Sequence, residues 1–475
     1  MNYLQFFLMR PEVSLIAVYL TIFIYDLVST GKARRLFHPI TCILMAALCG
    51  AVMSDTSTFT LFGGMYESNA MIVVMKAVLA FGSLLVILQA NKWLSSEHTS
   101  YKRGEFYVLL LSTLIGMFFM LSARHFLLLF IGIELASLPL ACLVAFDKYR
   151  HHSAEAGIKY ILTSLFSSAL MLYGISFLYG TCGTLYFTDM VSHITGSPMQ
   201  VFALVMFFSG LGFKISLVPF HLWTADSYEG APTSVTAYLS IISKAAGVFT
   251  LFIVLTKVFA PMTELWQTVI YITVVASITL ANLMAIKQRS LKRFMAFSSI
   301  SQVGYIMLAV IGGNAEGATA MVFYLIVYMM ANTAVFSIIE EVEWKTQSPA
   351  KRNTLRGFYK TNPKLTLLMT LALFSLAGIP PFAGFFSKFF VFMSAFGAGF
   401  QVLVFIALIN TVVSLYYYLL IVKAMYIETS DSPVPFIKSD AYTRISLIVC
   451  LSGILLLGIC SFVYAAIDKV AYTSL

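Results

Sequence analysis

The stretches LGFKISLVPFHLW (Leu211–Trp223) and LAGIPPFAGFFSKF (Leu376–Phe389) each combine an apolar helix, a proline and a lysine. Proline removes a backbone donor and clashes with the carbonyl group four residues earlier, so each stretch predicts a helix break. Inside a membrane such a break is tolerated only where the backbone is buried in protein or lines a hydrated cavity. The residues expected to break the helices are Pro219, Gly378, Pro380 and Pro381. The carbonyl groups that they free are those of Ile215, Leu376 and Ala377, and each needs a protein or water partner.

The composition places these breaks in a membrane protein. The chain has 475 residues, of which 60% are hydrophobic and 11% charged, far from the balance of soluble domains. Apolar runs long enough to cross a bilayer recur along the chain, and they are continuous rather than alternating, which excludes a β-barrel. We therefore predict an all-α polytopic protein in a lipid bilayer. The net charge of +9 is spread over short loops, so we expect no nucleic acid as a partner.

The apolar runs define about fourteen membrane spans, and the basic residues orient them. The spans cover residues 12–30, 39–53, 69–90, 105–122, 125–146, 158–180, 199–223, 232–257, 266–286, 295–312, 317–339, 364–398 (broken), 401–423 and 444–467. Lysine and arginine concentrate in the loops of one side, which the positive-inside rule assigns to the inner face. Both termini are then expected on the outer side.

The two broken spans, the seventh and the twelfth, are five spans apart. Spans 4–8 and 9–13 therefore form two five-helix units, and because five is odd the second unit crosses the membrane in the opposite sense. Inverted repeats with matching discontinuous helices are typical of transporters. The predicted divisions are flanking spans 1–3 (1–104), the first unit (105–258), the second unit (259–425) and flanking span 14 (426–475).

Three ionisable side chains, Glu134, Lys214 and Lys244, lie near the middle of apolar spans. A charge at bilayer depth costs roughly 2.5–3.5 kcal/mol on insertion scales, so such residues usually serve a function. A lone carboxylate in hydrocarbon would be neutral, and Lys214 is the expected partner that keeps Glu134 ionised. A titrating pair and a static ion pair would both fit, and Lys244 could be a structural cation. A fourth lysine, Lys388, follows the second break and could partly snorkel outward.

Other polar residues are weaker candidates for a proton path. His221, at the inner end of the seventh span, suits either a relay or a structural role. Glu155 and Lys159 share a helix face at the start of the sixth span, either as a surface pair or as an entry point to the buried carboxylate. Lys76 and Asp26 are expected to reach the membrane interface. Further side chains able to hydrogen-bond water are Ser298, Ser299, Ser301, Gln302, Tyr305, Tyr328, Asn332 and Tyr416.

Several sequence features bear on whether this chain holds a metal, a redox centre or a nucleotide. The longest charged loop, residues 340–364, begins with Glu340, Glu341 and Glu343 and is expected to be a solvated connector or a docking surface. The six cysteines show no ligand spacing, so we expect neither a metal site nor a disulfide. Nucleotide-binding and iron–sulfur motifs are missing as well.

Five strings together resemble the subunit N family of the proton-pumping NADH:quinone oxidoreductase, respiratory complex I. They are GIELASLPL (Gly132–Leu140), LGFKISLVPFHLW (Leu211–Trp223), LSIISKAA (Leu239–Ala246), SSISQVGY (Ser298–Tyr305) and LAGIPPFAGFFSKF (Leu376–Phe389). The resemblance covers nearly the whole chain and implies an antiporter-like fold with one half-channel per unit. It matches the family's proton-relay residues to Glu134, Lys214, Lys244 and Lys388. The lysine at the last position separates the chain from the related M subunit, which carries a glutamate there.

The resemblance also implies partners, cofactors and location. The expected neighbours are an M-type subunit on one side and small subunits such as K and J on the other, in a bacterial inner membrane. The whole complex would use NADH, flavin, iron–sulfur clusters and quinone, with none bound by this chain. The chain departs from the family at Gln302, where many relatives carry histidine, and at Lys76, which has no counterpart.

These features predict a lateral proton relay from Glu134 and Lys214 through Lys244 to Lys388, with release to the outer side. A subunit of a multisubunit cation/proton antiporter is an alternative, because its chains share the Glu–Lys–Lys pattern. An inert membrane scaffold, in which every lysine would be replaceable, is another, and a hydrogenase-linked pump is a third.

Overall fold

The computed structural model describes residues 4–29, 31–55, 57–97, 99–148 and 151–474. Within them, 13 helices are long and apolar enough to cross a membrane. Two shorter apolar helices, α17 (Pro363–Ala377) and α18 (Ala383–Gly397), stand where the broken twelfth span is predicted. The predicted all-α polytopic fold is confirmed, and the 13 long helices together with this broken one match the predicted number of spans.

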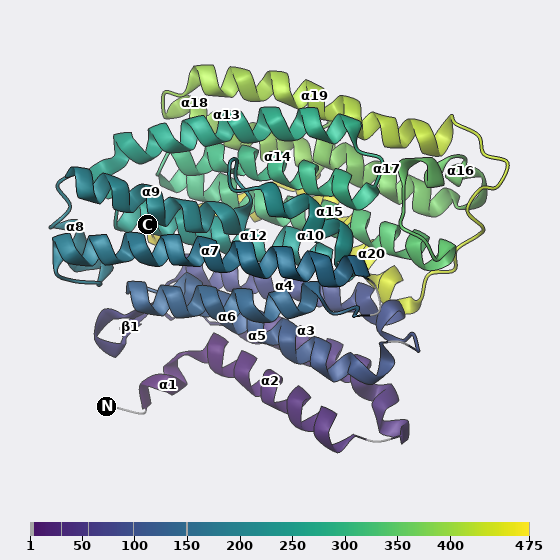
Figure 1. Cartoon of the computed structure of the whole chain (residues 1–475), viewed down its shortest axis with the longest axis horizontal. Coiled ribbons are helices and arrows are strands. Elements are labelled where there is room, and N and C mark those ends of the chain that lie inside the picture. Colours follow the sequence, from purple (N-terminus) through teal and green to yellow (C-terminus); the bar gives the residue numbers. More distant parts are fainter. Residues whose placement is uncertain (1–3, 30, 56, 98, 149–150, 475) are drawn as a thin grey trace.

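The helices run side by side, from α2 at one edge of the bundle to α19 at the opposite edge (Figure 1). The flanking part holds α1 (Leu4–Leu8), α2 (Arg10–Val28), α3 (Phe37–Met53), the antiparallel strands β1 (Phe59–Leu61) and β2 (Tyr66–Ser68), and α4 (Ala70–Leu94). The predicted first unit holds α5 (Arg103–Ser122), α6 (Phe126–Val144), α7 (His151–Cys182), α8 (Phe187–Val191), α9 (Pro198–Ile215), α10 (Leu222–Gly230), α11 (Thr233–Tyr238) and α12 (Lys244–Lys257). The predicted second unit holds α13 (Thr263–Lys287), α14 (Leu291–Ile311), α15 (Ala315–Thr346), α16 (Phe358–Thr361), α17, α18 and α19 (Gln401–Tyr426). The chain ends with α20 (Ala441–Ile459) and α21 (Phe462–Ser474).

Three elements fill the centre of the bundle. In an apolar 18-residue window of α14, 100% of the residues are buried. The corresponding share is 94% for α15 and for the continuous segment from α11 to α12, against 28% for α2. Polar groups on these central helices are therefore kept away from lipid, where an unpaired polar group would cost several kcal/mol. This position suits helices that carry buried lysines and a polar network.

Both predicted helix breaks are present. Helix α9 ends at Ile215, Ser216 adopts a left-handed backbone conformation with φ of 64°, and the chain resumes as α10. Helix α17 ends at Ala377, Gly378 has φ of 86°, and α18 begins five residues later. The bonds Val218–Pro219 and Pro380–Pro381 are cis. Each break turns the chain inside the bundle and leaves helix ends facing the interior.

A third irregularity was not predicted. A π-helical turn, Leu239–Ser243, joins α11 to α12 and ends directly before Lys244. Single π turns inside α-helices occur frequently at functional sites. The turn changes the angular position of Lys244 relative to the residues of α11.

Two predicted boundaries are wrong. The last span was predicted as one helix over 444–467, but α20 ends at Ile459 and α21 begins at Phe462. The end of α20 passes against the second break, where a Cβ atom on Gly458 would lie 2.6 Å from the Pro381 carbonyl oxygen, and the chain turns just beyond. Helix α15 continues to Thr346, so the acidic residues expected in a loop are helical.

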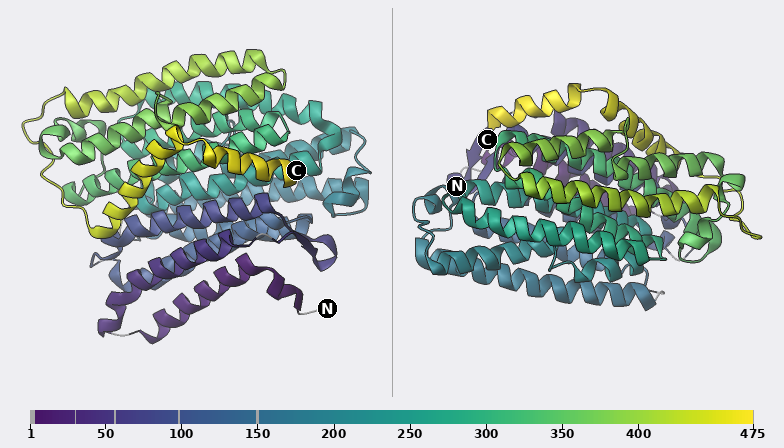
Figure 2. Two further views of the ribbon diagram at one scale, coloured as in Figure 1. Left: turned by 180° about the vertical axis from the view of Figure 1, so that it is seen from behind. Right: turned by 90° about the horizontal axis from the view of Figure 1, so that it is seen from above.

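The ends of the chain lie at the same end of the bundle. Helix α1 and the C-terminal end of α21 are found at the end that also carries β1 and α8 (Figures 1 and 2). A chain whose two ends lie on the same side of a membrane crosses it an even number of times, which agrees with fourteen spans. The inverted symmetry of the two units stays a prediction.

Candidate functional site

Close packing between α5 and α6 positions Glu134. A Cβ atom on Gly116 of α5 would lie 2.4 Å from the Ala136 nitrogen, and one on Gly132 of α6 would lie 2.8 Å from the Met120 nitrogen. Only glycine allows two helix backbones to approach so closely. The helix that carries Glu134 is thus held tightly in place, and Oε1 of Glu134 is buried without a hydrogen bond.

Lys214 lies in the last turn of α9, directly before the first break. Its side chain is 5% exposed, and Nζ donates a hydrogen bond to Ser137 Oγ at 2.8 Å. Ser137 is three residues after Glu134 on α6, and side chains at this spacing lie on one helix face. In the described chain no direct ion pair joins Glu134 and Lys214, and Ser137 Oγ accepts from the Lys214 ammonium group instead. That Lys214 keeps Glu134 ionised stays a prediction.

Lys244 is the most deeply buried lysine of the predicted relay. It is 1% exposed, and Nζ donates to Ser299 Oγ of α14 at 2.6 Å. The ammonium group also lies 5.4 Å from the centre of the Tyr228 ring. Within the described residues no carboxylate pairs with it, which leaves its charge stabilised by neutral oxygen and an aromatic face.

Lys388 points back to the second break. Its side chain is 4% exposed, and Nζ donates to the Ala377 carbonyl oxygen at 2.9 Å and lies 4.8 Å from the centre of the Tyr305 ring. It does not snorkel outward. The predicted need of the freed Ala377 carbonyl group for a partner is confirmed.

Gln302 links the same break to a polar network on α14, α15 and α19. Its Nε2 donates to the Leu376 carbonyl oxygen at 3.0 Å and to Tyr418 Oη at 3.1 Å. Tyr324 donates to Oε1 of Gln302, and Ser298 Oγ lies 2.6 Å from Tyr418 Oη. Both polar atoms of the Gln302 side chain therefore form hydrogen bonds. A neutral amide therefore holds the second freed carbonyl group.

A second small network lies between Lys244 and α15. Asn332 Nδ2 donates to Ser240 Oγ at 2.8 Å and to Tyr328 Oη at 3.0 Å. Ser240 belongs to the π turn before Lys244. Tyr328 is thus placed among the central polar groups, as predicted, while its role in proton transfer stays a prediction.

The candidates near the start of α7 form a charged network with α10 and α14. Lys159 pairs with Glu155 at 2.7 Å and with Asp226 at 2.7 Å, and Arg293 contacts Asp226 at 2.7 Å. Burial acts to raise the pKa of Asp226, but hydrogen bonds from Lys159 and Arg293 outweigh it and hold that pKa below its usual value. The network joins α7, α10 and α14. His221 lies apart, at the start of α10, and its Nδ1 is buried without a hydrogen bond.

Two predictions about the exposure of side chains are wrong, and a third agrees with the structure. Lys76 does not reach the interface: it is fully buried, with Nζ 2.6 Å from Glu12 Oε1 and 3.1 Å from Tyr66 Oη. Tyr416 was expected to line a wet path but is 55% exposed on the outside of α19. Asp26 is partly exposed and lies 3.7 Å from Arg34, as an interfacial residue would.

Several contact residues were missed in the sequence. Ser137 and Tyr418 hold predicted site residues but were not singled out, and Glu12 was not recognised as the partner of Lys76. Of these residues, only Ser137 could have been identified from the sequence, because it follows Glu134 by about one helical turn. In the described parts of the chain, no three His, Cys, Asp or Glu side chains gather as a metal site would, and the six cysteines are free.

Known proteins are similar to this chain over nearly its whole length. Residues 123–414 match the family model described as NADH:quinone oxidoreductase/Mrp antiporter, TM. A curated protein of Phocaeicola vulgatus, NADH-quinone oxidoreductase subunit N, is 58% identical over 98% of this chain and 98% of its own length. The chain belongs to the subunit N family of NADH-quinone oxidoreductase.

Solved structures agree with this membership. A chain of respiratory complex I from Thermus thermophilus is 30% identical, with a TM-score of 0.83, and the match covers 96% of this chain and 99% of that one. A chain of the Mrp complex from a Dietzia species has a TM-score of 0.86 at 20% identity, over 97% and 96% of the two chains. The second likeness shows only that both families share the antiporter-like fold.

Proposed function

We propose that this chain translocates protons as a membrane subunit of a respiratory NADH:quinone oxidoreductase, through Glu134, Lys214, Lys244 and Lys388, without itself binding NADH or a redox centre. One observation supports this most strongly. Each of the three lysines is almost fully buried, and each donates to a neutral oxygen atom rather than to a carboxylate. A carboxylate would hold the lysine in its charged form, whereas a neutral acceptor leaves both protonation states accessible.

The relay would begin at the pair in the first unit. Glu134 stabilises the charge of Lys214 across Ser137, so a movement that widens this gap makes the ammonium form costlier and releases its proton. The proton would then pass to Lys244 and on to Lys388. Water is expected to bridge the distances between these groups, because buried hydroxyl groups such as Ser301 Oγ and Tyr305 Oη have no protein partner.

The surroundings of the chain follow from the same proposal. We expect a bacterial inner membrane with both termini on the outer side. An M-type antiporter-like subunit would lie on one side, and small subunits such as K and J on the other. NADH, flavin, iron–sulfur clusters and quinone would act elsewhere in the complex, which supplies the movement that drives the relay.

The test is proton flux in the assembled, reconstituted complex. Glu134→Ala, Lys214→Ala and Lys244→Ala should each lower NADH-driven proton transport at least about tenfold, because each removes a proton carrier, while NADH dehydrogenation continues. Lys423→Ala, at an exposed lysine of α19, is the matched control and should pump normally. Unchanged flux in all three relay variants would exclude the relay and favour a scaffold. Sodium flux without NADH would favour an antiporter subunit.

A further inference from the structure

A polar cavity lies at the inner end of the central helices, away from the four relay residues. Its volume is about 420 Å³, and its walls come from the ends of α4 and α15, the link between α10 and α11, and the start of α14. The carboxylates that line it are Asp147, Glu340, Glu341 and Glu343, and the cations are Lys92 and Lys292. Acidic groups outnumber basic ones, so the cavity attracts cations, protons included.

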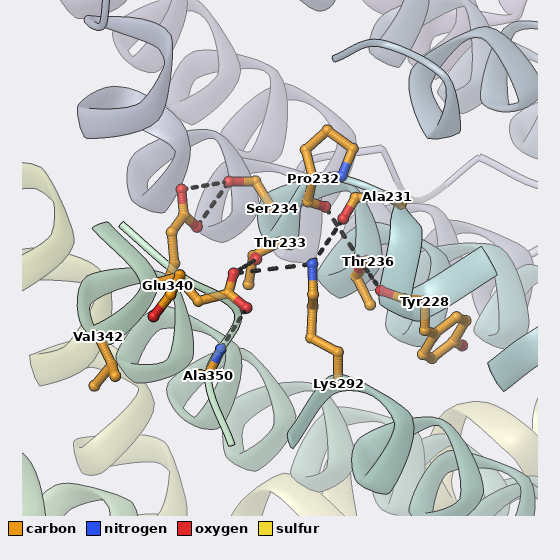
Figure 3. Close-up of polar contacts among 12 residues, drawn as sticks. Tyr228, Ala231, Pro232, Thr233, Ser234, Thr236, Lys292, Glu340, Val342 and Ala350 are labelled. Carbon is orange, nitrogen blue, oxygen red and sulfur yellow. Dashed lines mark hydrogen bonds and ion pairs between the residues drawn. The ribbon is translucent and has the colours of Figure 1, made fainter. Parts of the chain in front are cut away.

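The carboxylates on α15 are held in different ways (Figure 3). Ser234 donates to both carboxylate oxygens of Glu340 at 2.8 Å, and no cation pairs with Glu340 in the described chain. Glu343 accepts from Thr233 at 2.6 Å and lies 3.8 Å from Lys292. Glu340 is therefore the carboxylate here that is held by a hydroxyl group alone, an arrangement that suits both the charged and the neutral form.

Unpaired polar atoms indicate that the cavity holds water. Glu341 is 2% exposed, and one of its oxygens bonds Lys92 at 2.6 Å while the other, Oε1, has no partner. Gln89 is likewise 2% exposed, with an unpartnered Nε2 atom. Both line the cavity. Buried polar atoms are nearly always hydrogen-bonded to protein or to ordered water, so we expect water at these positions.

A stripe of polar side chains leads from the cavity into the bundle. Glu341, Ser337 and Thr333 lie four residues apart and share one face of α15. Ser337 donates to Gln89 Oε1 at 2.7 Å, whereas Thr333 Oγ1 is buried without a partner. The next residue inward, Asn332, also has an unpartnered oxygen, Oδ1.

The stripe ends at Asn332, beside the π turn that precedes Lys244. Asn332 Nδ2 donates to Ser240 in the π turn and to Tyr328, and Ser240 precedes Lys244 by about one turn. The unpartnered atoms on Thr333 and Asn332 mark the places where water would complete the connection. Polar side chains thus recur along α15 from the cavity to Asn332, which contacts the π turn that precedes Lys244.

We propose that this cavity is the proton-uptake chamber for Lys244, and that Glu340 and Glu341 are the carboxylates that collect protons from the inner side. One of these carboxylates would take a proton from water and pass it through ordered water to Lys244. Only O–H and N–H bonds would form and break in this transfer. The charged groups that face the pair are Lys92 of α4, Asp147 after α6, Lys292 of α14, Glu343 of α15 and Asp440 before α20. The inference rests on the proposed function, because it assigns an entry to that relay.

The test uses inside-out membrane vesicles that contain the whole complex, in which the inner face is accessible. The Glu340→Gln/Glu341→Gln variant should take up protons roughly tenfold more slowly at alkaline pH and be less affected at acidic pH, because the collecting groups matter most when protons are scarce. Millimolar formate should restore the rate by carrying protons into the cavity. Glu428→Gln, at an ion pair with Arg356 outside the cavity, is the matched control.

Further variants separate a proton-collecting role from a structural one. Glu340→Asp/Glu341→Asp keeps both carboxylates and should retain most of the uptake. Uptake at the normal rate in the double glutamine variant would overturn the proposal, as would an equal loss at every pH that formate does not restore. Lys244→Ala, measured in parallel, tests the relay itself: continued pumping there would refute the relay, whereas its loss beside a normal double glutamine variant would refute the uptake chamber alone.

Discussion

At the scale of the residue, four buried lysines of the membrane spans differ in the groups that hold them. Lys214, Lys244 and Lys388 each donate to a neutral oxygen, whereas Lys76 pairs with Glu12 at 2.6 Å and receives further support from Tyr66. A fully buried lysine that is paired directly with a carboxylate is expected to fix the position of helices rather than to titrate. The pair joins α2 to α4, and so it ties the first span to the bundle.

This difference predicts the behaviour of single and double variants at Lys76. Glu12→Gln or Lys76→Met alone should lower the stability of the protein by about 3–5 kcal/mol, since each leaves one buried charge unpaired. The double variant should recover much of that loss, with normal pumping per assembled complex. Thermal unfolding in mild detergent, arranged as a double-mutant cycle, measures the coupling. Losses that simply add would show that the two side chains act independently.

At the scale of the element, helix breaks and close helix contacts place the site. Proline marks both breaks, and the carbonyl groups freed at the second one are taken by Gln302 and Lys388. The break therefore creates the acceptors that hold the relay residue beside it. In the first unit the contact of α5 with α6 at Gly116 has the same effect, because it fixes the helix that carries Glu134.

Enlarging this contact should disturb the site without touching its polar groups. Gly116→Ala would force a methyl group to within 2.4 Å of the Ala136 nitrogen, so α6 must move. We expect a loss of about 1–3 kcal/mol in stability and slower proton pumping. Gly180→Ala is the matched control, because a Cβ atom there meets nothing within 4 Å, and it should be neutral or slightly stabilising. Pumping at the normal rate in Gly116→Ala would mean that the position of Glu134 tolerates the shift.

At the scale of the whole molecule, the central helices form a polar core inside an apolar shell. The inner cavity, the two small networks and the broken helices all meet on α11–α12, α14 and α15, which are the most buried elements. Helix α1 and the C-terminal end of α21 lie at the end of the bundle that also carries β1 and α8 (Figures 1 and 2). The distribution of basic residues predicts that this end faces the outer side.

Labelling of introduced cysteines should report this sidedness. In a variant without its native cysteines, one cysteine in place of Thr184, before α8, should react with an impermeant maleimide added to intact spheroplasts. One in place of Ser430, between α19 and α20, should react only after the membrane is opened. The expected pattern follows from both termini lying outside. The reverse pattern would invert the orientation and make the proposed uptake chamber face the outer side.

The fold class, the spans and both breaks follow from local rules that can be applied to the sequence alone. Apolar length, basic loops and proline each act on the residues next to them, so Pro219, Pro380 and Pro381 could be located without a structure. The buried lysines that we propose for the relay could equally be found in the sequence, because a charge inside an apolar run is costly wherever the helix packs.

Contacts between distant helices could not be read in this way. Whether Lys214 meets Glu134 or Ser137, and whether Lys76 snorkels or pairs with Glu12, depends on which helix faces which, and at what height. The π turn before Lys244 and the cavity beside Glu341 arise from the same long-range packing. Partners of buried groups are chosen by the tertiary structure, since desolvation and hydrogen bonding act between atoms in space and not along the chain.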